Sequence, residues 1–195
     1  MPAPGEFDLL FVMGGPMNIY EESKFPWLSE EKKAIRRAIN EGKGLVGVCL
    51  GAQLIADQLG GPVTRAEKAE IGWFPVKRAK DCPAELALPE DLTAYHWHGD
   101  RFAIPPGARH ILQSAGCLEQ GFLFEERILG LQCHLETNPA ALAALIDACR
   151  SEITSGPYIQ SAARMQAEPL ETYTSMHAVL FELLDHLASN CSRHA

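Results

Sequence analysis

Hydrophobic and polar positions follow two different periods along the first part of this chain. Phe7–Met13 and Gly44–Val48 are almost continuously apolar, which is typical of strands buried in a parallel sheet. After each run, apolar residues recur at helical spacing. Ser29 can cap the first of these helices, and Gly42 can end it. The apolar faces of the two helices are Ala34, Ile35, Ala38 and Ile39, then Leu50, Leu54, Ile55 and Leu59.

Shorter β-like runs follow in the middle of the chain, and helical patterns return near its end. Two of the runs flank Glu126-Arg127 at the spacing of a hairpin. Asn138-Pro139 predicts a helix to about Arg150, with asparagine at the cap and proline at the first position. A late apolar stripe at helical spacing predicts core packing: Met176, Val179, Leu180, Leu183, Leu184 and Leu187. The β-like runs are Ile71–Val76, Thr93–Trp97, His110–Gln113, Gly121–Glu125 and Ile128–His134.

This alternation of strands and helices predicts an α/β fold with a mostly parallel, twisted sheet flanked by helices. A chain of 195 residues suits a single domain, 1–195, with the motif-bearing part at about 7–150 and a helical segment at about 151–195. Ligands of such sheets bind at the carboxyl ends of the strands. Gly14, Cys49 and His134 all follow apolar runs, so we expect them to converge at one edge of the sheet.

Composition narrows the class of partner and the compartment. The formal net charge of −8, without basic runs, argues against binding to nucleic acid or anionic membranes. Six cysteines occur without a Cys-x-x-Cys pair, which fits a reducing compartment better than a disulfide framework. No segment has the pattern of a signal peptide or of a membrane span. We therefore expect a cytoplasmic protein.

Cys49 stands at the point where an apolar strand changes into a helix. A thiol at such a corner lies near the positive end of the helix, which favours the thiolate. The neighbouring Gly47 and Gly51 allow a sharp turn and close approach of a substrate. The alternative is that Cys49 is a small buried apolar side chain, as free cysteines often are.

Two further segments carry the groups that a cysteine nucleophile needs. His134 and Glu136 are two residues apart, so on an extended backbone both point to the same side and the carboxylate can orient the imidazole. Alone, this pair also fits a solvated strand end. Gly14-Gly15 ends the first apolar run, where backbone N–H groups can turn toward a ligand, although an ordinary turn before Pro16 has the same sequence.

Together the motifs resemble those of the class I, triad-type glutamine amidotransferase family. The matching segments are Gly-Gly-Pro at 14–16, Gly-x-Cys-x-Gly-x-Gln at 47–53 and Gln-x-His-x-Glu at 132–136. Trp97-His98-Gly99-Asp100 is similar to the Ser-His-Gly-Asp segment of GMP synthetase amidotransferase domains, with Trp97 in place of serine, and Glu70-Ile71-Gly72-Trp73 is similar to stand-alone GMP-synthase-like members. The resemblance covers about residues 7–148 and implies the flavodoxin-like fold of this family.

The resemblance implies a reaction and a role for each matching residue. The cysteine of this family attacks the side-chain amide of glutamine, ammonia leaves, and water releases glutamate from the γ-glutamyl thioester. By position, Cys49 would be the nucleophile, His134 the base and acid, and Glu136 its orienting group. The N–H groups of Gly15 and Leu50 would hold the oxyanion. The residues expected to help hold the substrate are Gly14, Gln53, His98, Gly99 and Asp100.

The chain also departs from the family pattern. Family members usually begin with a strand and a helix before the strand that leads into Gly-Gly-Pro, and here only Met1–Glu6 precede that strand. Loss of this unit would expose a strand edge, so we expect self-association. The chain has no P-loop, so a synthetase on another chain would use the ammonia.

Two other functions fit the same residues. The triad could hydrolyse other γ-glutamyl compounds, or the chain could be an inactive, amidotransferase-like binding subunit. We expect no cofactor and no metal. His96-x-His98 and Cys133-His134 hold ligand-type residues, but a catalytic zinc needs three converging ligands and no zincin-type helix motif is present.

Overall fold

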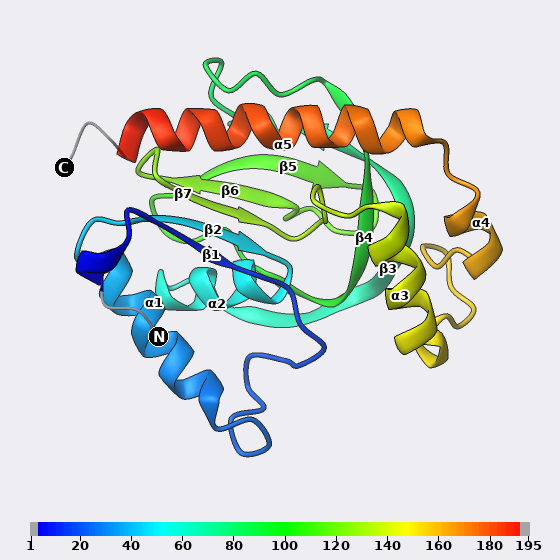
Figure 1. Ribbon diagram of the computed structural model, residues 1–195, viewed down its shortest axis with the longest axis horizontal. Coiled ribbons are helices and arrows are strands. Elements are labelled where there is room, and N and C mark those ends of the chain that lie inside the picture. The colour runs from blue at the N-terminus through cyan, green and yellow to red at the C-terminus, as the bar shows by residue number, and fades with distance from the viewer. Residues whose placement is uncertain (1–3, 192–195) are drawn as a thin grey trace.

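The computed structural model describes residues 4–191 and places the strands of this part of the chain in one seven-stranded sheet (Figure 1). The order across the sheet is β1-β2-β7-β6-β5-β3-β4. The strands are β1 (Leu9–Val12), β2 (Gly44–Val48), β3 (Val63–Arg78), β4 (Asp91–Phe102), β5 (Arg109–Ser114), β6 (Gly121–Phe124) and β7 (Ile128–Leu131). The helices are η1 (Pro4–Glu6), α1 (Trp27–Asn40), α2 (Leu50–Gln58), α3 (Pro139–Ala148), η2 (Arg150–Glu152), α4 (Ala162–Gln166) and α5 (Leu170–Cys191).

The α/β class is confirmed, and the sheet is mixed. Strand β2 pairs in parallel with β1 and β7, whereas β7-β6, β6-β5, β5-β3 and β3-β4 are antiparallel. The expectation of a mostly parallel sheet therefore holds only for the part that carries the Cys49 turn. Short hairpin connections, such as the β6–β7 turn predicted at Glu126-Arg127, force antiparallel pairing in the remainder.

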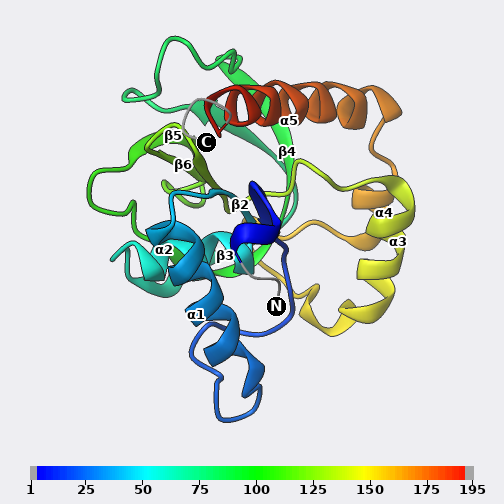
Figure 2. The ribbon, with the colours of Figure 1, turned by 60° about the vertical axis from the view of Figure 1, so that its left-hand side comes forward.

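Helices cover both faces of the sheet and make two apolar cores. Helices α1 and α2 lie on one face, and α5 crosses the other (Figures 1 and 2). The first core buries Leu28 and Ile35 of α1 against Leu54 of α2 and Phe102 of β4. The second core buries the predicted C-terminal stripe, including Met176 and Leu183, against aromatic residues of β3 and β4. The stripe is therefore core packing, as predicted.

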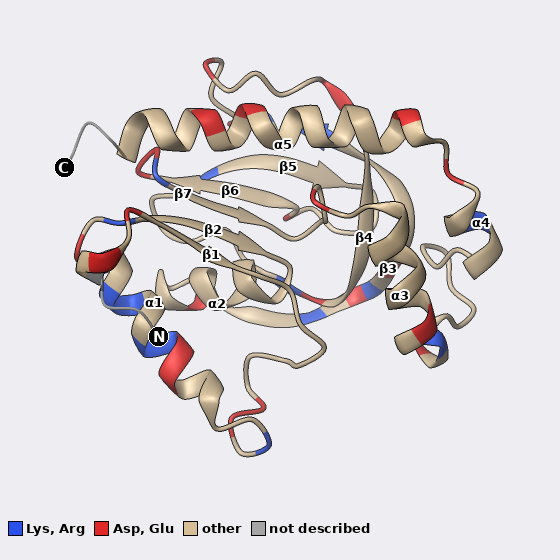
Figure 3. Cartoon of the chain, viewed as in Figure 1, with Lys and Arg blue, Asp and Glu red and all other residues tan. Residues whose placement is uncertain are grey.

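The outer face of α5 is acidic. The helix carries Glu171, Glu182 and Asp185 and has no lysine or arginine (Figure 3). Other charged positions lie mostly on helices and loops, away from the centre of the sheet (Figure 3). Within residues 4–191, no helix combines the length and the apolar composition that a membrane crossing requires.

Some predicted boundaries were wrong. Helix α1 begins at Trp27 with Pro26 at its N-cap position, so Ser29 lies inside the first turn and caps nothing. Proline already has the φ angle of a helix start, and inclusion of Leu28 buries that side chain completely. By contrast, α3 begins as predicted, with the Asn138 side chain accepting hydrogen bonds from the N–H groups of Ala140 and Ala141.

Strands β3 and β4 are much longer than their apolar segments. They pair from Val63 with Phe102 to Lys77 with Asp91, with an irregularity between Arg65 and Glu70. The added positions of β3 are mostly exposed and polar, so they have no apolar periodicity that could mark them as strand. This long ribbon curls around the end of the sheet (Figure 2).

Strand β1 lies at the edge of the sheet, and its only strand partner among residues 4–191 is β2. Val12 is buried, but Phe11 is 49% exposed. The prediction of a parallel strand is confirmed, whereas the expectation that it is buried on both faces was wrong.

Candidate active site

Cys49 occupies a strained turn between β2 and α2. Its backbone has φ 52° and ψ −109°, a conformation that L-residues rarely adopt. The cysteine N–H donates to Leu131 O at 2.7 Å, and the Cys49 carbonyl accepts from Gln53 at 3.0 Å, so both sides of the turn are fixed. The strain therefore positions the thiol at the carboxyl end of β2 and the amino end of α2.

The flanking glycines allow this turn because α2 packs directly against the strands. A Cβ atom on Gly51 would overlap the carbonyl oxygen of Val12 in β1. A Cβ atom on Gly47 would lie 2.7 Å from the backbone nitrogen of Ala52. The glycines in the motif are thus required by close backbone approach, as well as by the turn.

The Cys49 thiol lies between β4 and the loop after β7. It is largely buried, and Sγ donates to the carbonyl of Trp97 at 3.7 Å. It is also within hydrogen-bonding reach of the His134 ring. A Cβ atom added to Gly14 would lie 3.3 Å from His134 Cε1 and 3.5 Å from Cys49 Cβ, so the Gly14 loop closes over both side chains.

His134 and Glu136 make a short ion pair beside the thiol. Nδ1 of the imidazole lies 2.7 Å from Glu136 Oε1, and the N–H of His134 donates to Tyr95 O at 2.7 Å. With Nδ1 bound to the carboxylate, Nε2 remains for the thiol. Strand β7 ends before these residues, and the bridge of His134 to Tyr95 in β4 gives them the extended geometry that places both side chains together.

The local charges stabilise the ionised forms of this pair. Burial acts to lower the pKa of His134, but Glu136 and the hydrogen bond with Cys49 outweigh it and raise the pKa to about 10. Burial likewise acts to raise the pKa of Glu136, and the facing imidazole instead holds it below its usual value. Glu136 is therefore a carboxylate that favours an imidazolium at His134.

A cavity of about 840 Å³ opens in front of these side chains. Its wall includes Gly14, Gly15, Leu50 and the three residues Cys49, His134 and Glu136. Leu50 is the first residue of α2, where backbone N–H groups have no partner within the helix. A second hollow of about 600 Å³ lies beside α5 and is lined largely by charged side chains, with neither Cys49 nor His134 on its wall.

Asp100 is the polar anchor at the far side of the cavity. The carboxylate is almost fully buried; Oδ2 accepts from the Tyr20 hydroxyl at 2.9 Å, and Oδ1 lies 3.3 Å from Arg65 Nη1. Gly99 lies beneath the same guanidinium, since an added Cβ would lie 2.8 Å from Nη1. Sequence reasoning missed Tyr20 and Arg65, because neither lies in a motif and only the fold brings them to Asp100.

Gln53 and His98 are directed inward by the structure. The Gln53 amide donates to Gln132 Oε1 at 3.1 Å and to the Asp100 carbonyl at 3.3 Å. The His98 ring lies 3.0 Å from the same carbonyl and 3.1 Å from Glu70 Oε2. These side chains therefore hold β4 in place around Asp100, and the expectation that they reach toward a substrate gains no support from their bonds.

Fold and site define this chain as an α/β protein with a cysteine on a nucleophile elbow, next to a histidine–glutamate pair. The chain belongs to the glutamine amidotransferase class-I family, whose sequence model matches residues 3–146. The resemblance inferred from the three motifs is thereby confirmed.

Known proteins of similar sequence and structure have names that agree with this family. The glutamine amidotransferase-like protein YfeJ of Salmonella typhimurium is 31% identical over 195 residues, which cover 95% of this chain and 80% of that protein. The glutamine-hydrolyzing GMP synthase of Thermomicrobium roseum is 32% identical over 141 residues, which cover 70% of this chain but 25% of the synthase. A glutamine amidotransferase from Methylobacillus flagellatus superposes with a TM-score of 0.90 at 28% identity, covering 97% of this chain and 80% of that structure.

Proposed function

We propose that this chain hydrolyses the side-chain amide of glutamine through a γ-glutamyl thioester on Cys49. The observation that carries the proposal is the convergence of the Cys49 elbow with the His134–Glu136 ion pair on the wall of one cavity. Acyl transfer requires an activated nucleophile, a proton shuttle and fixed donors for the developing negative charge. Family membership supports the same reaction class.

In the first half-reaction, His134 takes the proton from Cys49 Sγ, and the sulfur attacks the amide carbon of glutamine. The tetrahedral oxyanion is held by the N–H groups of Gly15 and Leu50. His134 then gives the proton to the departing nitrogen, the C–N bond breaks, and ammonia leaves a thioester. Throughout, Glu136 orients the imidazole and stabilises its charged form.

In the second half-reaction, His134 takes a proton from water, and the resulting hydroxide attacks the thioester carbon. The C–S bond then breaks, glutamate leaves, and the sulfur recovers the proton from His134. The high pKa of His134 suits the acid step, because the imidazolium is the prevalent form before ammonia departs.

A synthetase on another chain is the partner that we propose for the ammonia. The curated GMP synthases contain this domain as about a quarter of their length, so the reaction named for them needs chain that lies outside the matched part. The 195 residues of this chain include no P-loop that could activate an acceptor with ATP.

The size of the cavity favours one alternative substrate class. A volume of about 840 Å³ lies in the range that encloses drug-sized ligands, and a free amino acid needs less. A γ-glutamyl amide with a larger amine would use more of this space and the same thioester chemistry.

The test is steady-state release of glutamate from glutamine and from γ-glutamyl amines by the purified protein, with Cys49→Ala as the matched control. We expect wild-type turnover of glutamine and none above background in the variant. Turnover of γ-glutamyl amines without turnover of glutamine would select the alternative. Failure of a glutamine-like electrophile to label Cys49 faster than the other five cysteines would support the inactive binding subunit instead.

A further inference from the structure

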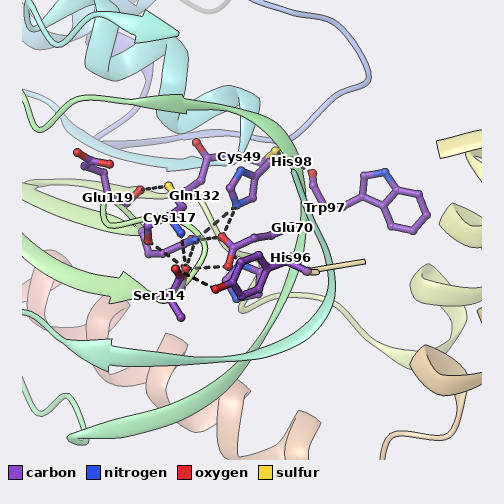
Figure 4. A network of polar contacts seen from close by, with 12 residues as sticks. Cys49, Glu70, His96, Trp97, His98, Ser114, Cys117, Glu119 and Gln132 are labelled. Carbon is purple, nitrogen blue, oxygen red and sulfur yellow. Dashed lines mark hydrogen bonds and ion pairs between the residues drawn. The ribbon is translucent and has the colours of Figure 1, made fainter. Parts of the chain in front are cut away.

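A second cluster of chemistry-bearing side chains lies inside the protein, on the face of β4 opposite to the Trp97 side chain (Figure 4). It consists of Glu70 of β3 and His96 and His98 of β4, which we call the Glu70 cluster. Glu70 pairs with His98 across the strands, and His96 is the next residue of β4 on the same face. Glu70 and His96 have no exposed surface, and His98 is 5% exposed.

His96 is the member of the cluster that the protein's own hydrogen bonds leave unexplained. Neither ring nitrogen has a hydrogen-bond partner among the described residues, and the nearby carbonyl of Phe74 does not meet the geometry of one. A buried polar group without a partner is costly, so such groups are rare in folded proteins. Nδ1 of His96 lies 3.7 Å from Glu70 Oε2, so the ring is aimed at the carboxylate but too far from it for a hydrogen bond.

We propose that Glu70, His96 and His98 bind one divalent zinc-type cation. Their ligand atoms all lie within 4.8 Å of one another, and His98 Nε2 is 3.1 Å from Glu70 Oε2. Ligand atoms around tetrahedral zinc are separated by roughly 3.3 Å, given Zn–N and Zn–O distances of about 2.0–2.2 Å. Small side-chain rotations therefore bring the three atoms around one ion, and both imidazoles and a carboxylate are donors that zinc prefers.

Gln120 supplies the fourth ligand. The buried Oε1 of Gln120 has no hydrogen-bond partner, whereas Nε2 lies 2.6 Å from Glu70 Oε2 and 3.4 Å from His98 Nε2. Half a turn of this amide would place its oxygen next to the carboxylate. Two oxygens at that distance repel each other unless a cation lies between them. Ion binding therefore gives partners to the orphaned atoms of both His96 and Gln120.

Other contacts fix the cluster and exclude water from it. Ser114 Oγ donates to Glu70 Oε1 at 2.8 Å, so one carboxylate oxygen is oriented and the other remains for the ion. Gly116 is required for this packing, because a Cβ atom there would lie 2.6 Å from Glu70 Oε1. With four protein ligands and no open position, the site is structural and joins β3, β4 and the segment before β6.

The sequence predicted no metal because its two candidate pairs lacked a third ligand. Glu70 lies 26 residues before His96, and only the pairing of β3 with β4 brings it into the set. The proposal is independent of the proposed glutamine hydrolysis, since zinc content is measured without any substrate.

The test is the zinc content of protein refolded in excess zinc chloride and desalted through a mild chelator. We expect about one zinc per chain in the wild type and in Cys49→Ala, which excludes binding by the active-site thiol. Less than about a tenth of a zinc per chain in the wild type would overturn the proposal. Cobalt chloride in place of zinc should give the visible absorption bands of tetrahedral Co²⁺, and their absence would also count against it.

His96→Phe gives a test with opposite signs for the two outcomes. In a metal-free interior, replacing an unpartnered imidazole with a phenyl ring of similar shape should leave the thermal midpoint unchanged or raise it. If the cluster binds zinc, the variant loses the ion, and its midpoint falls below that of the zinc-loaded wild type but not below that of the stripped wild type. His110→Phe, on β5, is the control and should keep its zinc; equal zinc in His96→Phe and the wild type would overturn the proposal.

Discussion

At the scale of single residues, the candidate chemistry depends on how Glu136 changes His134. The carboxylate fixes Nδ1, so the other ring nitrogen faces the thiol, and it favours the protonated ring. Cys49 contributes the other half of the arrangement through a strained backbone conformation that glycine would adopt more readily. Each of these effects can be removed by a single substitution.

Glu136→Gln should reduce glutamine turnover less than His134→Ala does. Loss of the carboxylate removes orientation and charge stabilisation, for which we expect kcat to fall by about 10²–10⁴-fold, whereas loss of the imidazole removes the proton shuttle itself. Both variants are compared with Cys49→Ala in the same assay of ammonia release. An unchanged kcat in Glu136→Gln would contradict the assigned role.

The same pair predicts how stability depends on pH. Because the pKa of His134 is raised to about 10 in the folded protein, its contribution is fully present below about pH 6.5, the value of an unperturbed histidine, and is lost as the pH rises toward 10. The free-energy gap between wild type and Glu136→Gln, from urea unfolding at several pH values, should therefore narrow from pH 6 to pH 10. A constant gap would show that the ion pair does not shift the pKa of His134.

At the scale of elements, the site is made by helix α2 lying directly on two strands and by a loop that reaches over the cavity. Gly51 permits the first contact, against Val12 in β1. The loop between β1 and α1 makes the second, where Tyr20 bonds Asp100 across 80 positions of sequence. Both contacts join segments that the sequence alone leaves unrelated.

Gly51→Ala should destabilise the protein by about 3 kcal/mol, because the new methyl group overlaps backbone and α2 must move away from β1. Gly5→Ala is the control, since a Cβ atom there meets no atom within 4 Å. Urea unfolding of the two variants measures the difference. Equal stability would mean that α2 does not pack closely on β1.

Tyr20→Phe should weaken substrate binding more than turnover. Loss of the hydroxyl removes one of the two partners of the Asp100 carboxylate, which lies on the cavity wall. We expect KM for glutamine to rise by about 3–10-fold with little change in kcat, the effect of about 1 kcal/mol of positioning. An equal fall in kcat would instead place the hydroxyl in the reaction itself.

At the scale of the whole molecule, β1 leaves an edge of the sheet open. Its backbone pairs with β2 on one side, and Phe11 and Met13 are each 49% exposed. Open, partly apolar edges favour pairing with another strand. Self-association therefore stays a prediction that the fold supports at a specific place.

Phe11→Lys should shift the protein toward the monomer in light scattering at micromolar concentration, because a charge at the edge opposes strand pairing. Leu118→Lys, at an exposed apolar position away from β1, is the control and should leave the mass unchanged. A wild type that is already a clean monomer would contradict the prediction.

Much of the fold was readable from local pattern. Strand β2 has the bounds Gly44–Val48 of its apolar run, and α2 and α3 follow their predicted starts at Leu50 and Pro139. Errors arose where tertiary packing outweighs pattern. Leu28 extends α1 beyond the predicted cap, and the polar half of β3 is strand only because β4 pairs with it.

The sequence by itself determined the family and the chemistry-bearing motifs, because a strand-to-helix turn with cysteine between glycines is a local arrangement. Only the tertiary structure decided which distant groups meet: Tyr20 and Arg65 on Asp100, and Glu70 between two histidines. Those contacts depend on strand pairing and loop placement, which are set by the burial of the whole sheet and leave no periodic signal in the residues concerned.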